Sequence, residues 1–281
     1  MSAAILYIFL WASAFVPSRI LSRSAPPLWT LSVRFLVAGA LLVAVARALR
    51  LEFPRDRPTW LRLALLGLTG NAIYLGCTYL ALKHLSAGMG AILASTNPLL
   101  LALVAPRLLG EPLSLRKICG LLLGFSGVLV AMQARAGTQT ALPLDVLLAL
   151  GGVCGLVAST VLYKRMQARP HPLVLNALQL SCAGLWLLPA AVLREGAPHV
   201  PLSWPVLASF TYLVLILSVG ASMLWFFILR HGEASRVSAF YFLTPVFGLL
   251  LGALLLGEKL VPLDAGGLLL IASGLFLTAR G

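Results

Sequence analysis

Three polar and aromatic residues share one face of a predicted helix in an apolar stretch of the chain. Asn71, Tyr74 and Thr78 lie at positions i, i+3 and i+7, which places them on the same side of an α-helix. An amide and two hydroxyls can donate and accept hydrogen bonds, and a tyrosine ring can stack on another ring. This combination indicates a surface that binds a small solute.

A second set with similar periodicity begins 147 positions later (218 − 71). Ser218, Ser222 and Trp225 lie at i, i+4 and i+7 of another predicted helix. In this register Asn71 corresponds to Ser218, and Thr78 corresponds to Trp225. Two related helices with matching faces are what a cavity between two halves of a protein requires. The candidate substrate-binding residues from these faces are Asn71, Tyr74, Thr78, Ser222 and Trp225.

Three further residues are candidates for the same cavity because of their type and position. Trp11 shares a helical face with Tyr7 in the first apolar run, and Asn97 and Tyr241 each lie shortly before a proline. For the aromatic rings the alternative is packing in the core or at the membrane interface. For Asn97 and Asn71 the alternative is a hydrogen bond between helices, since an unpaired amide is costly in an apolar environment.

Arg34 is the cation that lies well inside an apolar run. At 1.5 Å per residue it would sit about 9 Å from the start of its helix. A basic side chain at this depth could hold the carboxylate of a substrate. It could equally extend its flexible chain to the outer surface. Its counterpart in the second half is the uncharged Gln179, so its role is not duplicated.

Composition places these residues in a membrane protein. Of the 281 residues, 60% are hydrophobic and only 10% are charged, whereas soluble domains have roughly 25% charged residues. Apolar runs near the length that crosses a bilayer recur along the chain. We therefore expect an all-α integral membrane protein in contact with the lipid bilayer, with little chain left for a soluble domain.

Hydropathy and loop residues predict ten spans. The predicted ranges are 3–21, 28–46, 61–82, 86–108, 115–133, 143–165, 172–193, 204–229, 234–256 and 262–279. Fourteen of the 21 Lys and Arg residues would lie on one side, six on the other, and one within a span. Since basic loops stay in the cytoplasm, we expect both termini there. No basic residue precedes the first apolar run, so we expect a retained span and not a secretory signal.

Several function classes are excluded by what the sequence lacks. The net charge of +13 comes from clusters between apolar runs, which indicates topology and contact with anionic lipid, not nucleic acid. The four cysteines show no metal-ligand spacing, and no GxxxxGK[ST] phosphate loop occurs. The four histidines lie at loops or span ends, which argues against a membrane enzyme. We expect no cofactor and no metal.

The two halves of the chain repeat one phrase. Pro98 and Glu111 correspond to Pro245 and Glu258, each pair 147 positions apart (245 − 98 and 258 − 111). The sequence therefore predicts two five-helix repeats, 1–136 and 137–281. Five is an odd number, so the second repeat must be inverted relative to the first. Inverted repeats are typical of transporters whose substrate site lies between the halves.

The paired prolines predict matching kinks. Pro98 and Pro245 each remove a backbone donor and clash with the preceding turn. We interpret them as gating or kink residues that shape a central cavity, with improved packing as the alternative. Glycines at helical spacing near the end of each half, such as Gly127 and Gly274, indicate close helix packing.

The ten-span plan, the five-plus-five duplication and the phrase from proline to Gly-Glu resemble the EamA-type branch of the drug/metabolite transporter superfamily, over essentially the whole chain. Within it, the sequence is most similar to bacterial aromatic-amino-acid exporters. The resemblance implies an exporter of the bacterial inner membrane, whose two halves enclose a central cavity. We expect it to act as a monomer on small-molecule substrates.

Substrate class and coupling follow from the ionisable residues. No Asp or Glu lies deep in a predicted span, and the first span lacks the Glu through which small multidrug relatives couple to protons. We therefore expect facilitated export of aromatic and neutral amino acids by alternating access. The alternatives are a proton-coupled exporter of drugs or other metabolites, and a scaffold or receptor without flux.

Overall fold

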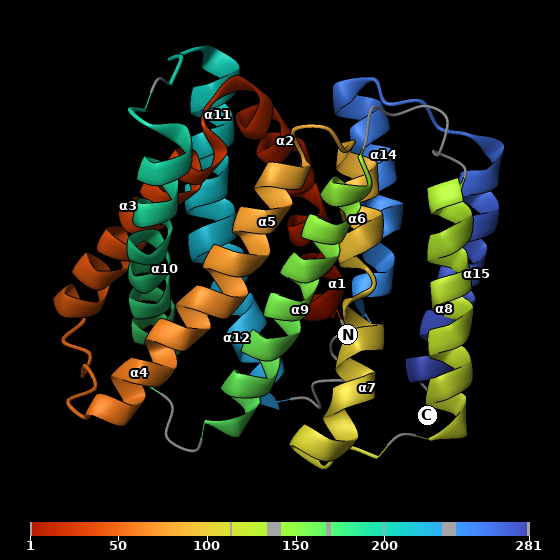
Figure 1. Ribbon diagram of the computed structural model, residues 1–281. Helices are drawn as coiled ribbons and strands as arrows, with labels where there is room; N and C mark the ends of the chain where they lie inside the picture. The colour runs from red at the N-terminus through yellow and green to blue at the C-terminus, as the bar shows by residue number, and fades with distance from the viewer. Residues whose placement is uncertain are drawn as a thin grey trace.

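The computed structural model describes residues 2–112, 114–133, 142–166, 170–198, 200–231 and 240–279. Over this part of the chain it consists of helices joined by short connections, with no strand (Figure 1). The predicted boundary between 136 and 137, and the start of the predicted range 234–256, lie outside the described residues.

The described residues of the predicted ranges are largely helical. The first half contains α1 (Ser2–Ser13), α2 (Phe15–Ser24), α3 (Pro27–Ala48), α4 (Arg57–Leu66), η1 (Gly67–Ile73), α5 (Tyr74–Ala81), α6 (Ala87–Ala94), α7 (Asn97–Leu109) and α8 (Leu115–Gln133). The second half contains α9 (Pro143–Arg165), α10 (Pro172–Glu195), α11 (Trp204–Tyr212), η2 (Leu213–Ala221), α12 (Ser222–His231), η3 (Phe240–Leu243), α14 (Thr244–Leu256) and α15 (Pro262–Ala279).

Seven helical segments among the described residues are long and apolar enough to cross a membrane. They are Ala4–Ser24, Pro27–Ala48, Arg57–Ala81, Ala87–Leu109, Pro143–Arg165, Pro172–Glu195 and Trp204–Ile228, and two shorter apolar helices are Thr244–Leu256 and Pro262–Gly274. Their outer faces expose many large apolar side chains, such as Leu147 and Leu254. These faces suit contact with lipid, so the chain is a multi-pass membrane protein.

Corresponding helices of the two halves pack against each other in opposite directions. In α3 and α10, the backbone of Gly39 lies against Ser181. Nearer the start of α3, the amide of Leu28 donates to Glu195 at the end of α10 (3.1 Å). Because contacts move up one helix as they move down the other, α3 and α10 are antiparallel.

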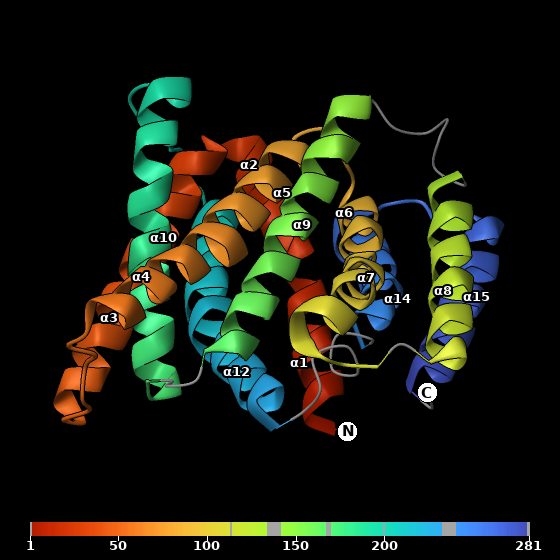
Figure 2. The same ribbon diagram turned by 60° about the horizontal axis from the view of Figure 1, so that its bottom comes forward.

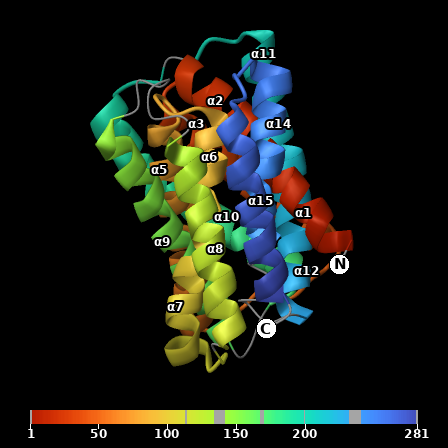
Figure 3. The ribbon, with the colours of Figure 1, turned by 90° about the vertical axis from the view of Figure 1, so that its right-hand side faces the viewer.

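The same arrangement recurs for α8 and α15, which lie side by side at one edge of the molecule (Figures 1 and 3). A Cβ added at Gly127 would lie 2.6 Å from the carbonyl oxygen of Gly267, and one at Gly274 would lie 2.5 Å from that of Gly120. The two backbones therefore touch, as small residues permit. The view in Figure 2 keeps this pair apart from α3, α4 and α10 on the opposite edge.

The shared phrase from proline to Gly-Glu has a local structural explanation. Gly110 and Gly257 end α7 and α14 with φ of 69° and 64°, the left-handed conformation that favours glycine at a helix C-terminus. At the other end, a turn at Ser95 and Thr96 separates α6 from α7 just before Pro98. The short 3-10 segment η3 precedes α14 in the same way. In both halves the chain changes helix just before the proline, which is the second residue of the helix that follows.

Two π-helical segments also occupy corresponding positions. Gly67–Ile73 and Leu213–Ala221 each interrupt a long helix that passes through the middle of the molecule. Adding 147 to the first range gives 214–220, which falls within the second. A π turn inserts an extra residue into a helix and is frequent at functional sites. The sequence did not predict these segments.

Candidate functional site

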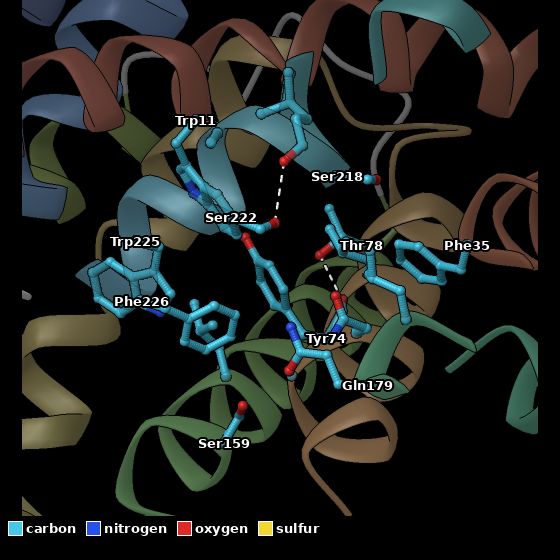
Figure 4. A pocket seen from close by; sticks show the side chains of 18 of the residues that line it. Trp11, Phe35, Tyr74, Thr78, Ser159, Gln179, Ser218, Ser222, Trp225 and Phe226 are labelled. Atoms are coloured by element: carbon cyan, nitrogen blue, oxygen red, sulfur yellow. Dashed lines mark hydrogen bonds between the residues drawn. The ribbon is translucent and has the colours of Figure 1, made fainter. Parts of the chain in front are cut away.

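A pocket with a volume of about 80 Å³ lies between the two halves of the chain. Its walls come from α1, α2, α3, η1 and α5 of the first half, and from α9, α10, η2, α12 and η3 of the second. A water molecule needs roughly 10–15 Å³ of such volume, so the pocket holds several waters or part of a small solute. Figure 4 shows Trp225 and Phe226 on one side of it, and Phe35 and Thr78 on the other.

Five aromatic side chains form a continuous cluster along one wall of the pocket. We define the aromatic cluster as Tyr7, Trp11, Tyr74, Trp225 and Tyr241, which come from α1, α5, α12 and η3. Trp11 stacks on Tyr74 with ring centroids 5.7 Å apart and an angle of 8°, and Tyr7 stacks on Trp225 at 5.0 Å. Tyr241 presents its ring at 85° to Trp11 and 82° to Trp225. Such geometry favours aromatic attraction.

One hydrogen bond ties this cluster together across the chain. The hydroxyl groups of Tyr7 and Tyr241 are 2.8 Å apart. Both side chains are almost completely buried, so one hydroxyl donates to the other where water has little access. The bond links α1 to η3 and fixes one edge of the wall.

Arg34 reaches the pocket from α3 and is 4% exposed. Its Nε donates to the hydroxyl of Ser218 and its Nη1 donates to the hydroxyl of Tyr79, both at 3.0 Å. Ser18 donates to the same tyrosine oxygen at 3.2 Å. The guanidinium is therefore held inside the molecule, and the alternative that it extends to the outer surface is wrong.

The predicted hydroxyl groups are partly used within their own helices. Thr78 donates to the carbonyl oxygen of Tyr74 (2.8 Å), and Ser222 donates to that of Leu217 (3.1 Å), as Figure 4 shows. A hydroxyl that donates in this way still has acceptor capacity for a solute. Asn71 lies half-buried in η1 and faces the same space.

The structure brings eight of the nine predicted binding residues to one pocket. They are Trp11, Arg34, Asn71, Tyr74, Thr78, Ser222, Trp225 and Tyr241. Asn97 is fully buried but does not line it, and its side-chain nitrogen and oxygen have no partner among the described residues. Pro98 and Pro245 also lie outside the lining, each as the second residue of its helix.

Sequence reasoning missed the contribution of α9. Leu156, Ser159, Thr160 and Tyr163 all line the pocket. Their spacing of i, i+3, i+4 and i+7 is the signal that could have revealed them. Tyr7 and Ser218 also line it, and both were recognised as neighbours of candidates without being chosen. Tyr79 was missed because its role appears only through its bond to Arg34.

The acidic groups in the described part of the chain lie at helix ends or in connections between helices, and not in the pocket. None of the described residues that line the pocket is an Asp or Glu. Glu258 instead pairs with Arg19 and accepts the backbone N–H groups of Ala87 and Gly88 at the start of α6, at 2.8 and 3.1 Å. No group of three or more metal-ligating side chains occurs among the residues that the structure describes.

Comparison with known proteins identifies relatives that match nearly the whole chain. The uncharacterized transporter YvbV of Bacillus subtilis is 29% identical over 272 residues, which cover 96% of this chain and 88% of that protein. The uncharacterized inner membrane transporter YedA of Escherichia coli K12 is 29% identical over 280 residues, 98% and 89% of the two chains. A probable amino-acid metabolite efflux pump of Salmonella typhimurium is 28% identical over 292 residues, 99% and 94%.

The fold is shared with a solved crystal structure. Its TM-score is 0.72 at 24% identity, and the similarity covers 99% of this chain and 94% of the other. The sequence profile of the EamA-like transporter family matches residues 1–133 and, a second time, residues 144–280. These two matches cover most of the chain, and the chain therefore belongs to the EamA-like transporter family.

Proposed function

We propose that this transporter exports aromatic and neutral amino acids across the bacterial inner membrane by alternating access. In this proposal the chain forms ten spans in two inverted repeats, 1–136 and 137–281, with both termini in the cytoplasm. It works as a monomer and as a facilitator, without coupling to protons. The substrate binds in the central pocket, and the prolines Pro98 and Pro245 allow the helices beside it to move.

The pocket carries this proposal. Both halves of the chain line it, and it combines an aromatic cluster with one buried cation, Arg34. An aromatic amino acid offers a ring for the first and a carboxylate for the second. The antiparallel packing of α3 with α10 and of α8 with α15 supports the inverted repeat. Transporters of this design bind solutes between their halves.

The names of the relatives agree with a transporter, and one of them favours this substrate class. The Salmonella relative is described as a probable amino-acid metabolite efflux pump. The family and the other relatives named above are also described as transporters. A proton-coupled exporter of drugs or other metabolites is the second candidate. It ranks lower because none of the described residues that line the pocket is an Asp or Glu that could carry the proton.

Transport by the purified protein tests this proposal. The measurement is uptake of labelled phenylalanine into proteoliposomes, with and without an imposed pH gradient, against protein-free vesicles. We expect uptake that reaches equilibrium at the same level in both conditions. Accumulation driven by the gradient would contradict the facilitator mechanism, and no uptake of phenylalanine, methionine or threonine would contradict amino-acid export.

Variants of the aromatic cluster test the site itself. Trp11→Ala and Trp225→Ala should each reduce uptake, because both rings face the pocket and stack on other rings. Trp204→Ala is a matched control, since Trp204 is 80% exposed at the start of α11. If all three variants fold and take up phenylalanine at the same rate, the proposed site is contradicted.

A further inference from the structure

The guanidinium of Arg34 forms its hydrogen bonds to neutral groups among the described residues. Nε donates to Ser218 and Nη1 donates to Tyr79, and both acceptors are hydroxyls. A guanidinium carries five N–H donors in a rigid fork, so these two bonds leave three donors for another acceptor. The pocket lies at this position, because Arg34 and Ser218 both line it.

The described residues that line the pocket have a formal charge of +1. Arg34 is the single charged residue among them, and none of them is Asp, Glu, Lys or His. Arg34 forms no ion pair within 4.0 Å with a carboxylate of the described residues. A buried cation without a counter-ion is unfavourable in a low-dielectric environment, so the site gains free energy when an anion enters.

A substrate ammonium group has no comparable partner in this pocket. It would meet the positive charge of Arg34, and only neutral groups of the described lining would attract it, namely ring faces such as that of Trp11 and side-chain oxygens such as that of Asn71. A carboxylate, by contrast, can accept two parallel N–H bonds from one guanidinium. The charges therefore discriminate between the two ends of an amino acid.

We propose that the pocket recognises an apolar carboxylate, and that the α-amino group of a substrate is dispensable. The inference rests on the proposed function only for the assumption that solutes enter this pocket. It extends the substrates to monocarboxylates with an aromatic or apolar body, such as 3-phenylpropionate. It excludes amines of the same shape, such as 2-phenylethylamine.

Ser218 and Tyr79 are positioning residues in this proposal. They lie on η2 and α5, so the two bonds hold one guanidinium between the two halves of the chain. Ser18 donates to the Tyr79 oxygen and leaves the tyrosine proton free to turn away from the cation. A shift of either segment would therefore move Arg34 and change the hydrogen bonds that its guanidinium can donate to a carboxylate.

Direct binding is the first test, because it does not depend on transport. The melting temperature of the protein in detergent is measured with phenylalanine, 3-phenylpropionate, 2-phenylethylamine or sodium chloride at equal ionic strength. We expect the first two compounds to raise it and the last two to leave it unchanged. Stabilisation by 2-phenylethylamine, or equally by chloride, would overturn the inference.

Variants of Arg34 test whether the guanidinium is the group that binds the carboxylate. Arg34→Gln, which copies the residue Gln179 of the second half, should weaken binding of 3-phenylpropionate by about tenfold or more. Arg34→Lys keeps the charge and should retain part of the affinity. Arg47→Gln is the matched control, because Arg47 is exposed at the end of the same helix. Unchanged affinity in folded Arg34→Gln would overturn the inference.

Competition during transport separates this inference from the proposed function. Unlabelled 3-phenylpropionate should inhibit phenylalanine uptake into proteoliposomes, and 2-phenylethylamine should not. Phenylalanine uptake that only the amine inhibits would leave amino-acid export standing and overturn the inference. Binding of 3-phenylpropionate through Arg34 without any phenylalanine uptake would support the inference and contradict amino-acid export.

Discussion

Arg19 of α2 and Glu258, which follows α14, form an ion pair with Nη1 and Oε1 2.5 Å apart. The same carboxylate accepts the backbone N–H groups of Ala87 and Gly88 at the start of α6. Its negative charge there also interacts favourably with the helix dipole. Three helices that are distant in the sequence are thereby joined at one end of the molecule, away from the pocket.

Glu258→Gln should loosen this junction. The substitution removes the charge that Arg19 and the α6 terminus share, and we expect a loss of stability of about 1–3 kcal/mol. Thermal unfolding in detergent measures it. Arg19→Gln should give a similar loss, and the double variant should lose less than the sum of the two. Strictly additive losses would contradict a direct interaction between these side chains.

Tyr7→Phe and Tyr241→Phe should have nearly the same effect on stability. Each removes one partner of the same buried hydroxyl pair, at a cost of about 0.5–1.5 kcal/mol, and the double variant should add little. Tyr241→Ala also removes a ring that contacts three others, so we expect about 3–5 kcal/mol. Equal losses for the Phe and Ala variants, measured by thermal unfolding, would contradict the packing role.

Gly274→Ala should destabilise the contact between α8 and α15. The added Cβ would lie 2.5 Å from the carbonyl oxygen of Gly120, so the helices must separate, at about 1–3 kcal/mol. Gly266→Ala on the same helix is the control, because a Cβ there meets nothing within 4 Å. It should be neutral or gain up to about 1 kcal/mol from helix propensity. A melting temperature that falls equally in both would contradict close packing at Gly274.

The proposed orientation predicts which loops a membrane-impermeant thiol reagent can reach. In a cysteine-free background, Ser203→Cys should react from outside the intact cell, because residues 196–203 join α10 to α11 on the external side in this proposal. Asp56→Cys, in front of α4, should react only after the membrane is made permeable. The reverse pattern would show that the termini are outside.

The sequence revealed the site where helical phase was sufficient. Trp11 and Tyr7 share a face at i and i+4, and both line the pocket. Asn71 and Tyr74, however, lie on either side of the junction between η1 and α5, where the angle per residue changes. They still reach one pocket, but phase alone could not establish this.

Other parts of the site depend on packing that hydropathy does not contain. The spacing of Ser159, Thr160 and Tyr163 indicates a face of α9, but nothing in the sequence says that this face turns inward. Asn97 shows the opposite case, since an amide in an apolar run was expected at the cavity. It is instead buried at the start of α7, outside the pocket. The depth of a residue in a span does not determine which way its side chain points.

The paired π segments have a consequence for motion. An α-helix turns by about 100° per residue, so a π segment that relaxes to α geometry rotates everything beyond it relative to its partner helices. At Gly67–Ile73 such a change would re-aim Tyr74 and Thr78, and at Leu213–Ala221 it would re-aim Ser222 and Trp225. Each long helix thus has a change of helical angle directly beside the residues that face the pocket.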